Sequence, residues 1–237
     1  MIKKIGIVFL VLLAIIAGAL FWLRSNLDGL VRSAMVKYGS EMTQAKVSVG
    51  NAKINAVDGE GVISNFIIGN TNGFKTPYAF KVQEFSVVID PASLTSDVIL
   101  IKKITIIAPD IIYEKGKVVT NFDAIQKNIA DYLGPSDDTA SGGKKLIVDK
   151  LVIRKARAQA AAAFMEGEMV AFDLPDLTMR NLGKAKGGIT PGELGQAVAS
   201  ALKKQLIGAI SFDKLGNAAK AAAGTAGGAV DKIKNLF

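Results

Sequence analysis

Hydrophobic and polar residues follow different periods along this 237-residue chain, and each period predicts an element. The first segment, from Ile5 to Leu23, is apolar and carries no charge. At about 1.5 Å per residue, a helix of that length comes close to the roughly 30 Å hydrocarbon thickness of a bilayer. The pattern predicts a transmembrane anchor over residues 5–23, preceded by a cytoplasmic tail over residues 1–4.

A cleaved signal peptide is the alternative for the same segment. Lys3 and Lys4 would form its basic start, and residues 17–19 are small enough for a cleavage site. Phe21 and Trp22 follow that site and are typical of the aromatic belt at a membrane surface, which favours a retained anchor. Basic residues flank the run on both sides and do not fix its orientation, so the cytoplasmic tail rests on analogy with other signal anchors.

A helical period continues beyond the anchor and predicts a juxtamembrane helix over residues 24–40. Its apolar positions are Leu27, Leu30, Val31, Ala34 and Tyr38, and Gly39 is a typical C-terminal stop. We expect this stripe to pack on the domain that follows rather than on lipid.

From Ala45 onward the period changes to two, which is typical of strands. Val47 and Val49 alternate with polar residues, and the turn-rich segment from Val57 to Gly61 closes a hairpin. Glu114 to Lys117 reads as another tight turn. The further predicted strands are Phe85 to Ile89, Val98 to Ile107, Ile111 to Tyr113, Val118 to Val119, Leu146 to Arg154, and a strand around Met169 to Leu177.

One helix interrupts the strands, with Asn121 as its cap and apolar positions at Phe122, Ile125, Ile129 and Leu133. A polar loop over residues 134–144 follows it. Because strand otherwise follows strand, without a regular alternation of strands and helices, we predict a β-rich α+β domain over residues 41–182 with an antiparallel sheet.

The C-terminal region, residues 183–237, has a helical pattern of its own. Thr190 can cap a helix and Pro191 can occupy its first position, ahead of an apolar stripe that includes Leu194, Val198 and Leu202. An Ala/Gly-rich stretch from Leu215 to Ile233 follows as a weakly amphipathic segment. It can form a lid over the sheet, a helix on anionic lipid, or a frayed tail.

Composition excludes much of enzymology, because the chain holds no Cys and no His. Thiol nucleophiles, Ser-His-Asp triads, histidine acid/base pairs and Cys/His zinc sites are therefore excluded. The formal net charge of +8 is spread along the chain without a basic run that includes aromatic residues, so anionic lipid headgroups are a better partner than nucleic acid.

Two carboxylate pairs are candidates for acid/base or metal sites: Asp110 with Glu114, and Asp137 with Asp138. No second cluster of ligand type accompanies either pair, and Asp137 and Asp138 fall in the polar loop. We expect no enzyme activity, no cofactor and no metal site.

Several short segments together resemble the opening region of the AsmA-like family. They are Tyr38-Gly39, Val47 and Val49, Gly59-Glu60-Gly61, the run IGNTNGFKT at residues 68–76, residues 93–97, and residues 104–114. The likeness covers roughly residues 26–114, with a weaker echo to residue 182. Gly69, Asn70 and Gly73 make residues 68–74 a turn that returns Phe74 to the core, which is a structural explanation of that run.

The resemblance implies a function as well as a fold. AsmA-like proteins are related to repeating β-groove lipid-transfer proteins, in which a curved sheet carries acyl chains on one apolar face. It implies a single-pass protein of a bacterial inner membrane, mostly periplasmic, that handles phospholipid or supports outer-membrane biogenesis. Its partners would be the bilayer, bound lipid, and a second copy or an envelope protein.

The residues expected to face lipid are Val47, Val49, Phe85, Val87, Ile89, Ile104 and Ile106. Each strand adds only about 4.8 Å along such a groove, so one copy is too short to cross a periplasm. The alternative is a closed sheet core covered by helices, in a membrane-tethered scaffold or regulatory subunit.

Overall fold

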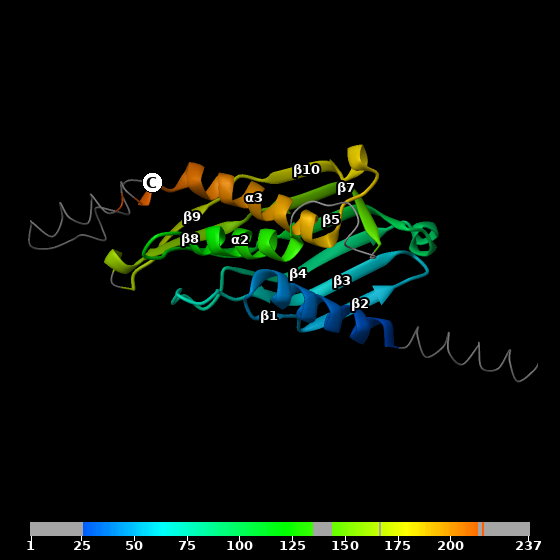
Figure 1. The fold of residues 1–237 in the computed structure, drawn as a ribbon, viewed down its shortest axis with the longest axis horizontal. Coiled ribbons are helices and arrows are strands. Elements are labelled where there is room, and N and C mark those ends of the chain that lie inside the picture. Colours follow the sequence, from blue (N-terminus) through cyan, green and yellow to red (C-terminus); the bar gives the residue numbers. More distant parts are fainter. Residues whose placement is uncertain (1–25, 135–143, 166, 213–214, 216–237) are drawn as a thin grey trace, which may run out of the picture.

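The computed structural model describes residues 26–134, 144–165, 167–212 and 215. Within these ranges, ten strands form one sheet with helices beside it (Figure 1). The strands are β1 (Val47–Ser48), β2 (Asn51–Asn55), β3 (Glu60–Ile68), β4 (Phe80–Ile89), β5 (Val98–Ile107), β6 (Asp110–Lys115), β7 (Lys145–Arg154), β8 (Arg157–Ala162), β9 (Val170–Asp173) and β10 (Leu177–Leu182). The helices are residues 26–43, α2 (Asn121–Leu133) and α3 (Pro191–Ala209), with short 3₁₀ turns η1 (Pro91–Thr95), η2 (Ala163–Met165) and η3 (Lys184–Lys186).

The sheet is mostly antiparallel but mixed. At one edge, β1 and β2 both pair with β3, and β3 pairs with β4. Beyond β4 the order continues in two rows: β5, β7 and β10 in one, and β6, β8 and β9 in the other. The β5–β7 and β6–β8 pairs are parallel. The prediction of an antiparallel sheet is wrong at this point, because α2 returns the chain from the end of β6 to the start of β7, and such a crossover makes the next strand parallel.

Three long strands are interrupted at neighbouring positions by residues with left-handed backbone. Asn65 in β3, Ala108 between β5 and β6, and Lys155 between β7 and β8 have φ of 52°, 49° and 53°. The interruptions in the last two strands are joined by a hydrogen bond of 2.8 Å from the Ala108 amide to the Arg154 carbonyl. The pairing register is the same on both sides of these residues, so each of them turns its strand locally without inserting a β-bulge. The sheet therefore consists of two halves that meet along one line.

The helices lie over one face of the sheet, which we call the inner face. Ile63, Phe85 and Ile106 follow one another across β3, β4 and β5 on this face. Ile63 packs with Val31 and Met35 of the 26–43 helix, whereas Phe85 and Ile106 also pack against the cluster that includes α2 and α3 residues. Figure 1 shows the 26–43 helix (blue) over β1–β3 and α3 (orange) over β5 and β7.

The helix over residues 26–43, which was predicted as a juxtamembrane helix, differs from its prediction in where it ends and in which residues it packs with. It continues past Gly39 to residue 43, and a Cβ built at Gly39 would lie 3.2 Å from Val47 Cγ1. Gly39 therefore allows the helix to approach β1 closely instead of ending it. The packing residues are Val31, Met35 and Val36, whereas Leu30 and Tyr38 are 45% and 52% exposed.

The same helix also closes one edge of the sheet with polar side chains. Arg32 Nε donates to the Val49 carbonyl at 2.8 Å, and Asp28 Oδ1 accepts from the Ile54 amide at 2.8 Å. Ser40 Oγ accepts from the Val47 amide at 3.0 Å. The outer edge of β1 and β2 thus finds hydrogen-bond partners, which protects an edge strand against pairing with another chain.

Both inner helices begin with a capping box. Thr120 caps α2 and exchanges hydrogen bonds with Asp123, so Asn121, predicted as the cap, is instead the first helical residue. Thr190 caps α3 with Glu193 as its partner, and Pro191 occupies the first turn, as predicted.

Two other strand predictions differ from the structure. Val118 and Val119 form no strand, since only an isolated bridge joins Lys115 to Thr120, and Val118 is 81% exposed. The strand predicted around Met169 to Leu177 is divided into β9 and the start of β10. The predicted anchor (5–23), most of the polar loop, and the stretch after Leu215 lie outside the described residues.

Candidate functional site

The inner face gathers the residues that were expected to face lipid. In the β4–β5 pair, Phe85 lies opposite Ile106 and Val87 opposite Ile104, while Ile89 follows on the same side. Alternation along a strand puts these side chains on one face. Val47 and Val49 lie at the far edge, beside the 26–43 helix. The structure therefore brings five of the seven residues together and places the other two apart.

Coverage of this face by helices is uneven. Val47 and Val49 are each 3% exposed and Ile104 is 9% exposed, so packing encloses them. Leu202 and Leu206 of α3 are 3% and 0% exposed and belong to the same core cluster. In the centre of the sheet, α3 and its neighbours thus exclude solvent.

A strip of the inner face is only partly buried. We call it the β4–β5 strip, and it consists of Phe85, Val87, Ile89, Ile99 and Ile106. By contrast, Val148 and Ile153 on the neighbouring strand β7 are 0% and 1% exposed. Along β4 the partly buried residues Phe85, Val87 and Ile89 form an unbroken row, whereas on β5 the buried residues Ile101 and Ile104 separate Ile99 from Ile106. A partly exposed apolar row is the kind of surface that takes an apolar ligand or partner.

A second candidate is the loop over residues 69–77, where the family-like run lies. We call the group that holds it the polar clamp: Asn70, Thr76, Glu114 and Asn121. The Glu114 carboxylate, which is 7% exposed, accepts from the Lys75 amide (2.8 Å), the Thr76 amide (2.8 Å) and the Thr76 hydroxyl (2.6 Å). The loop backbone is thus fixed by a buried side chain from β6.

Asn121 joins this loop to β6 and α2. Its side-chain amide donates to Asn70 Oδ1 (2.9 Å) and to the Ile112 carbonyl (2.7 Å), and its oxygen accepts from the Glu114 and Phe122 amides (both 3.0 Å). Asn121 is fully buried and its polar atoms are partnered on both sides. These bonds explain the motif as a structural element. The expected turn is present, but Phe74 is only partly buried and belongs to neither core cluster, so its expected return to the core is wrong.

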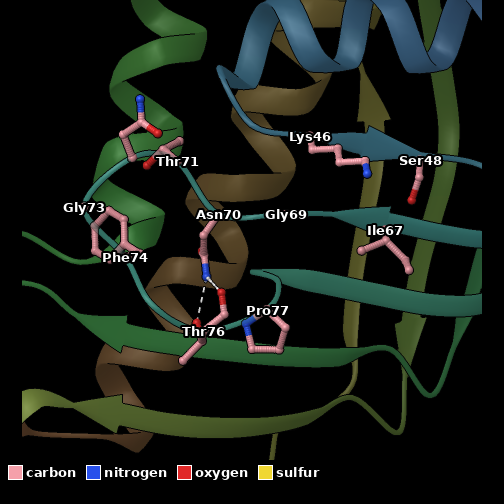
Figure 2. Close-up of a pocket in the computed structure, with 11 residues that line it drawn as sticks. Lys46, Ser48, Ile67, Gly69, Asn70, Thr71, Gly73, Phe74, Thr76 and Pro77 are labelled. Carbon is pink, nitrogen blue, oxygen red and sulfur yellow. Dashed lines mark hydrogen bonds between the residues drawn. The ribbon is translucent and has the colours of Figure 1, made fainter.

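A shallow pocket of about 430 Å³ lies beside the loop (Figure 2). Lys46, Ser48, Ile67, Asn70 and Thr76 are among its lining residues. Ser48 and Ile67 are paired across β1 and β3, next to the inward Val47 and Ile68, so they face the opposite side of the sheet. The pocket is therefore separate from the β4–β5 strip, and its lining is largely polar.

Asp110 and Glu114 do not act as a carboxylate pair, because each has its own partners. Asp110 accepts from the Tyr78 hydroxyl at 2.7 Å and from Gln159 Nε2 at 3.2 Å. Burial, the hydrogen bond to Asp110 and the charge of Asp110 together raise the pKa of Tyr78 to about 12. Asp137 and Asp138 lie outside the described residues.

One ion pair joins the two inner helices. Lys203 of α3 contacts Asp123 of α2, and both side chains are about 30% exposed (27% and 30%). Burial acts to raise the pKa of the Asp123 carboxyl, but hydrogen bonds from Lys203 and Thr120 outweigh it and hold that pKa below its usual value. The pair links α2 to α3 where the two helices pack antiparallel to each other.

Among residues 26–134, 144–165, 167–212 and 215, no group of three or more acidic, Cys or His side chains is placed to hold a metal ion. Among the same residues, no helix combines the length and the apolar character of a membrane span. The comparisons with known proteins gave no matching family model, no matching curated protein and no matching solved structure.

Sequence reasoning missed the role of Asn121 and the strand β8. The sequence RAQAAA of β8 has little strand propensity, because four of its six residues are alanine, and its alternation of polar and apolar residues extends only from Arg157 to Ala160. A weak signal for Asn121 did exist, because an Asn directly after a helix-capping Thr is free to bond elsewhere.

Proposed function

We propose that this protein is a membrane-tethered binding protein that takes lipid hydrocarbon on the β4–β5 strip. The observation that carries the proposal is the uneven coverage of the inner face. Phe85, Val87 and Ile89 are only partly buried, while the same face under α3 is closed. The AsmA-like resemblance of residues 26–114 and the apolar run before residue 24 support the same reading.

The strip suits one acyl chain rather than a continuous channel. Five residues of β4 span about 17 Å at roughly 3.4 Å per residue, which is the length of a typical acyl chain. A chain laid along Phe85, Val87 and Ile89 would cover apolar area that is otherwise partly in water, and each buried CH₂ contributes about 0.8 kcal/mol. Transport between membranes would require further copies or a partner.

The test is native mass spectrometry with lipid extraction on residues 24–237, exported to the periplasm and checked for folding by circular dichroism. We expect stoichiometric phospholipid, lost in Val87→Asp. The matched control is Val88→Asp, because Val88 is partly buried like Val87 but faces the other side of β4, between Glu60 of β3 and Lys103 of β5. Lipid retained by both folded variants, or absent from the folded wild type, contradicts the proposal.

A closed-core scaffold is the second candidate, and one observation favours it. Leu206 is fully buried and Leu202 nearly so, in the same core as the sheet residues. If the core is complete, the partly buried strip is simply the margin of the helix layer. A folded, lipid-free wild-type protein would favour this function.

A further inference from the structure

Two turns at one end of the sheet are held together as one rigid unit. The Ile89 amide donates to the Gly59 carbonyl at 2.7 Å. A Cβ built at Gly59, whose φ is 70°, would lie 2.1 Å from the Ile89 carbonyl oxygen and 3.0 Å from Pro91 Cγ. The turn after β2 therefore lies directly on the start of η1. We call the two segments, residues 56–59 and 91–96, the tip.

The tip exposes two large apolar side chains where turns usually carry small or polar ones. Val57 is 62% exposed and Leu94 is 36% exposed. The main chain around Leu94 is fixed, because Lys144 Nζ donates to the Leu94 carbonyl at 2.9 Å and to the Ser96 carbonyl at 2.7 Å. These apolar groups are thus presented by a rigid backbone.

Basic side chains surround the tip. The amide of Lys145 donates to the Asp97 carbonyl at 2.9 Å, and the Leu146–Ile189 bridge brings η3, with exposed Lys184 and Lys186, to the same end. Acidic groups are present too: Asp58, which bonds to Asn55; Asp90, which pairs with Lys102 at 3.6 Å; Glu193, which pairs with Lys186 at 3.8 Å; Asp97; and Glu60. Apolar side chains with lysines around them are typical of a protein surface at the membrane interface.

The chain itself limits how far this end can lie from a membrane. Asp28 Oδ1 accepts from the Ile54 amide, so residue 28 lies beside the last residues of β2, just before the tip. The predicted anchor ends at Leu23, five residues earlier. Five residues reach at most about 17 Å when extended and about 7.5 Å when helical. The opposite end, after β6, is separated from the tip by β5 and β6, which together extend for at most about 60 Å.

From these observations we propose that the tip rests on the bilayer surface, with Val57 and Leu94 among the lipid headgroups and the lysines around them close to lipid phosphates. The domain then stands on its tip, and the end with Val118 faces away from the membrane. The inference rests on the predicted anchor and on the membrane tether of the proposed function, but not on lipid binding at the β4–β5 strip.

The natural absence of Cys makes a site-directed test direct, because each introduced Cys is the sole thiol. Full-length Val57→Cys, Leu94→Cys and Val118→Cys are spin-labelled and reconstituted in nanodiscs of zwitterionic and anionic phospholipid. Accessibility to oxygen, which concentrates in the bilayer, is compared with accessibility to a water-soluble nickel chelate. We expect labels at 57 and 94 to favour oxygen several-fold relative to the label at 118, although Val118 is the most exposed of the three at 81%.

Equal, water-like values at all three positions overturn the proposal, and so do three membrane-like values, which would mean that the domain lies flat. Repeating the measurement in purely zwitterionic nanodiscs tests the lysines: a lower oxygen preference at position 57 supports their part, and no change overturns that part. If the wild-type protein has no bound lipid in the mass-spectrometry experiment, but the labels at positions 57 and 94 lie in the membrane interface, only the proposal of lipid binding at the β4–β5 strip is refuted. If lipid is bound but the labels at positions 57 and 94 are in water, only the proposal that the tip rests on the bilayer is refuted.

Discussion

The apolar centre under α3 and the polar clamp around the 69–77 loop are both buried, but they are stabilised in opposite ways. In the apolar centre, Leu206, Val148 and Ile153 fit together without any polar atom to satisfy. In the clamp, Glu114 and Asn121 are buried because seven hydrogen bonds, three to Glu114 and four through Asn121, replace those to water. The stability of the apolar centre depends on how well side chains fill its volume, and that of the polar clamp depends on the geometry of its hydrogen bonds.

This difference has consequences for tolerance to change. In a core of aliphatic side chains, the free energy of unfolding falls gradually with each buried methylene group that is removed. A buried polar network fails when one member is lost, because the remaining donors and acceptors are left without water and without a partner. Substitutions in the two regions therefore test whether the clamp is as essential to the fold as the apolar centre.

The largest effect is expected for Leu206→Ala. Removing a fully buried leucine leaves a cavity and should lower the free energy of unfolding by about 2–5 kcal/mol, measured by urea denaturation. Ile207→Ala is the matched control, since Ile207 is 56% exposed and should change stability by no more than about 0.5 kcal/mol. Equal effects at the two positions would mean that α3 does not cover the sheet.

The next effect is expected in the clamp. Asn121→Ala leaves the Glu114 amide and the Ile112 carbonyl buried without their partner and should cost about 2–4 kcal/mol in the same measurement. Asn128→Ala removes a single bond, from Asn128 Nδ2 to the Thr43 carbonyl, and should cost about 1 kcal/mol. Similar losses for both variants would show that the clamp is no more cooperative than an ordinary hydrogen bond.

Glu114→Gln sharpens the comparison, because it keeps the shape and removes one acceptor. The new NH₂ group would face an amide or hydroxyl donor of residues 75–76, so we expect a loss of about 1–3 kcal/mol. Hydrogen exchange should increase at the Lys75 and Thr76 amides. Exposed Glu84→Gln is the control, and unchanged exchange in the Glu114 variant would contradict the assigned role.

Thr71→Val tests the one imperfect group beside the clamp. The Thr71 hydroxyl is buried without a hydrogen-bond partner, in a residue that is 8% exposed. Replacing it with a methyl group of similar size should leave stability unchanged or raise it by up to about 1 kcal/mol. A clear loss in thermal unfolding would mean that a bound water or ligand group satisfies this hydroxyl.

The smallest effect at neutral pH is expected for Tyr78→Phe. The pKa of Tyr78 is raised to about 12 in the folded protein, above its ordinary value of 10.0, so folding favours the protonated phenol. That stabilisation is complete below pH 10 and is lost as the pH rises from 10 to 12. The variant should therefore lose less stability than the wild type across this interval in denaturant titrations. Parallel losses would contradict the raised pKa of Tyr78, which burial and the contact with Asp110 produce together.

Strongly periodic segments could be predicted from sequence because their local preference agrees with the fold. The alternation of Phe85, Val87 and Ile89 gave β4 and its apolar face, and Thr190 with Pro191 gave the start of α3. The turn over residues 68–74 was also expected from its Gly and Asn residues. In each case a short segment holds all the information that the element needs.

Long-range structure could not be predicted in this way. The parallel β5–β7 pair depends on where α2 returns the chain, and β8 is a strand only because β6 and β9 pair with it on both sides. The candidate site shows the same limit. Alternation placed Phe85, Val87 and Ile89 on one face, but only the packed helices decide that Ile104 is enclosed while Val87 is partly exposed.

The sequence by itself determined the periods: an apolar run before residue 24, alternating strands, and capped helices. Tertiary structure alone decided the order of the strands, the burial of Glu114 and Asn121 in one clamp, and the proximity of Val57 to Leu94 in the tip. The physical reason is that periodicity and capping are set by neighbours within a few residues. Burial and hydrogen-bond satisfaction depend instead on groups that folding brings together, such as Asn70 and Asn121, which are 51 residues apart.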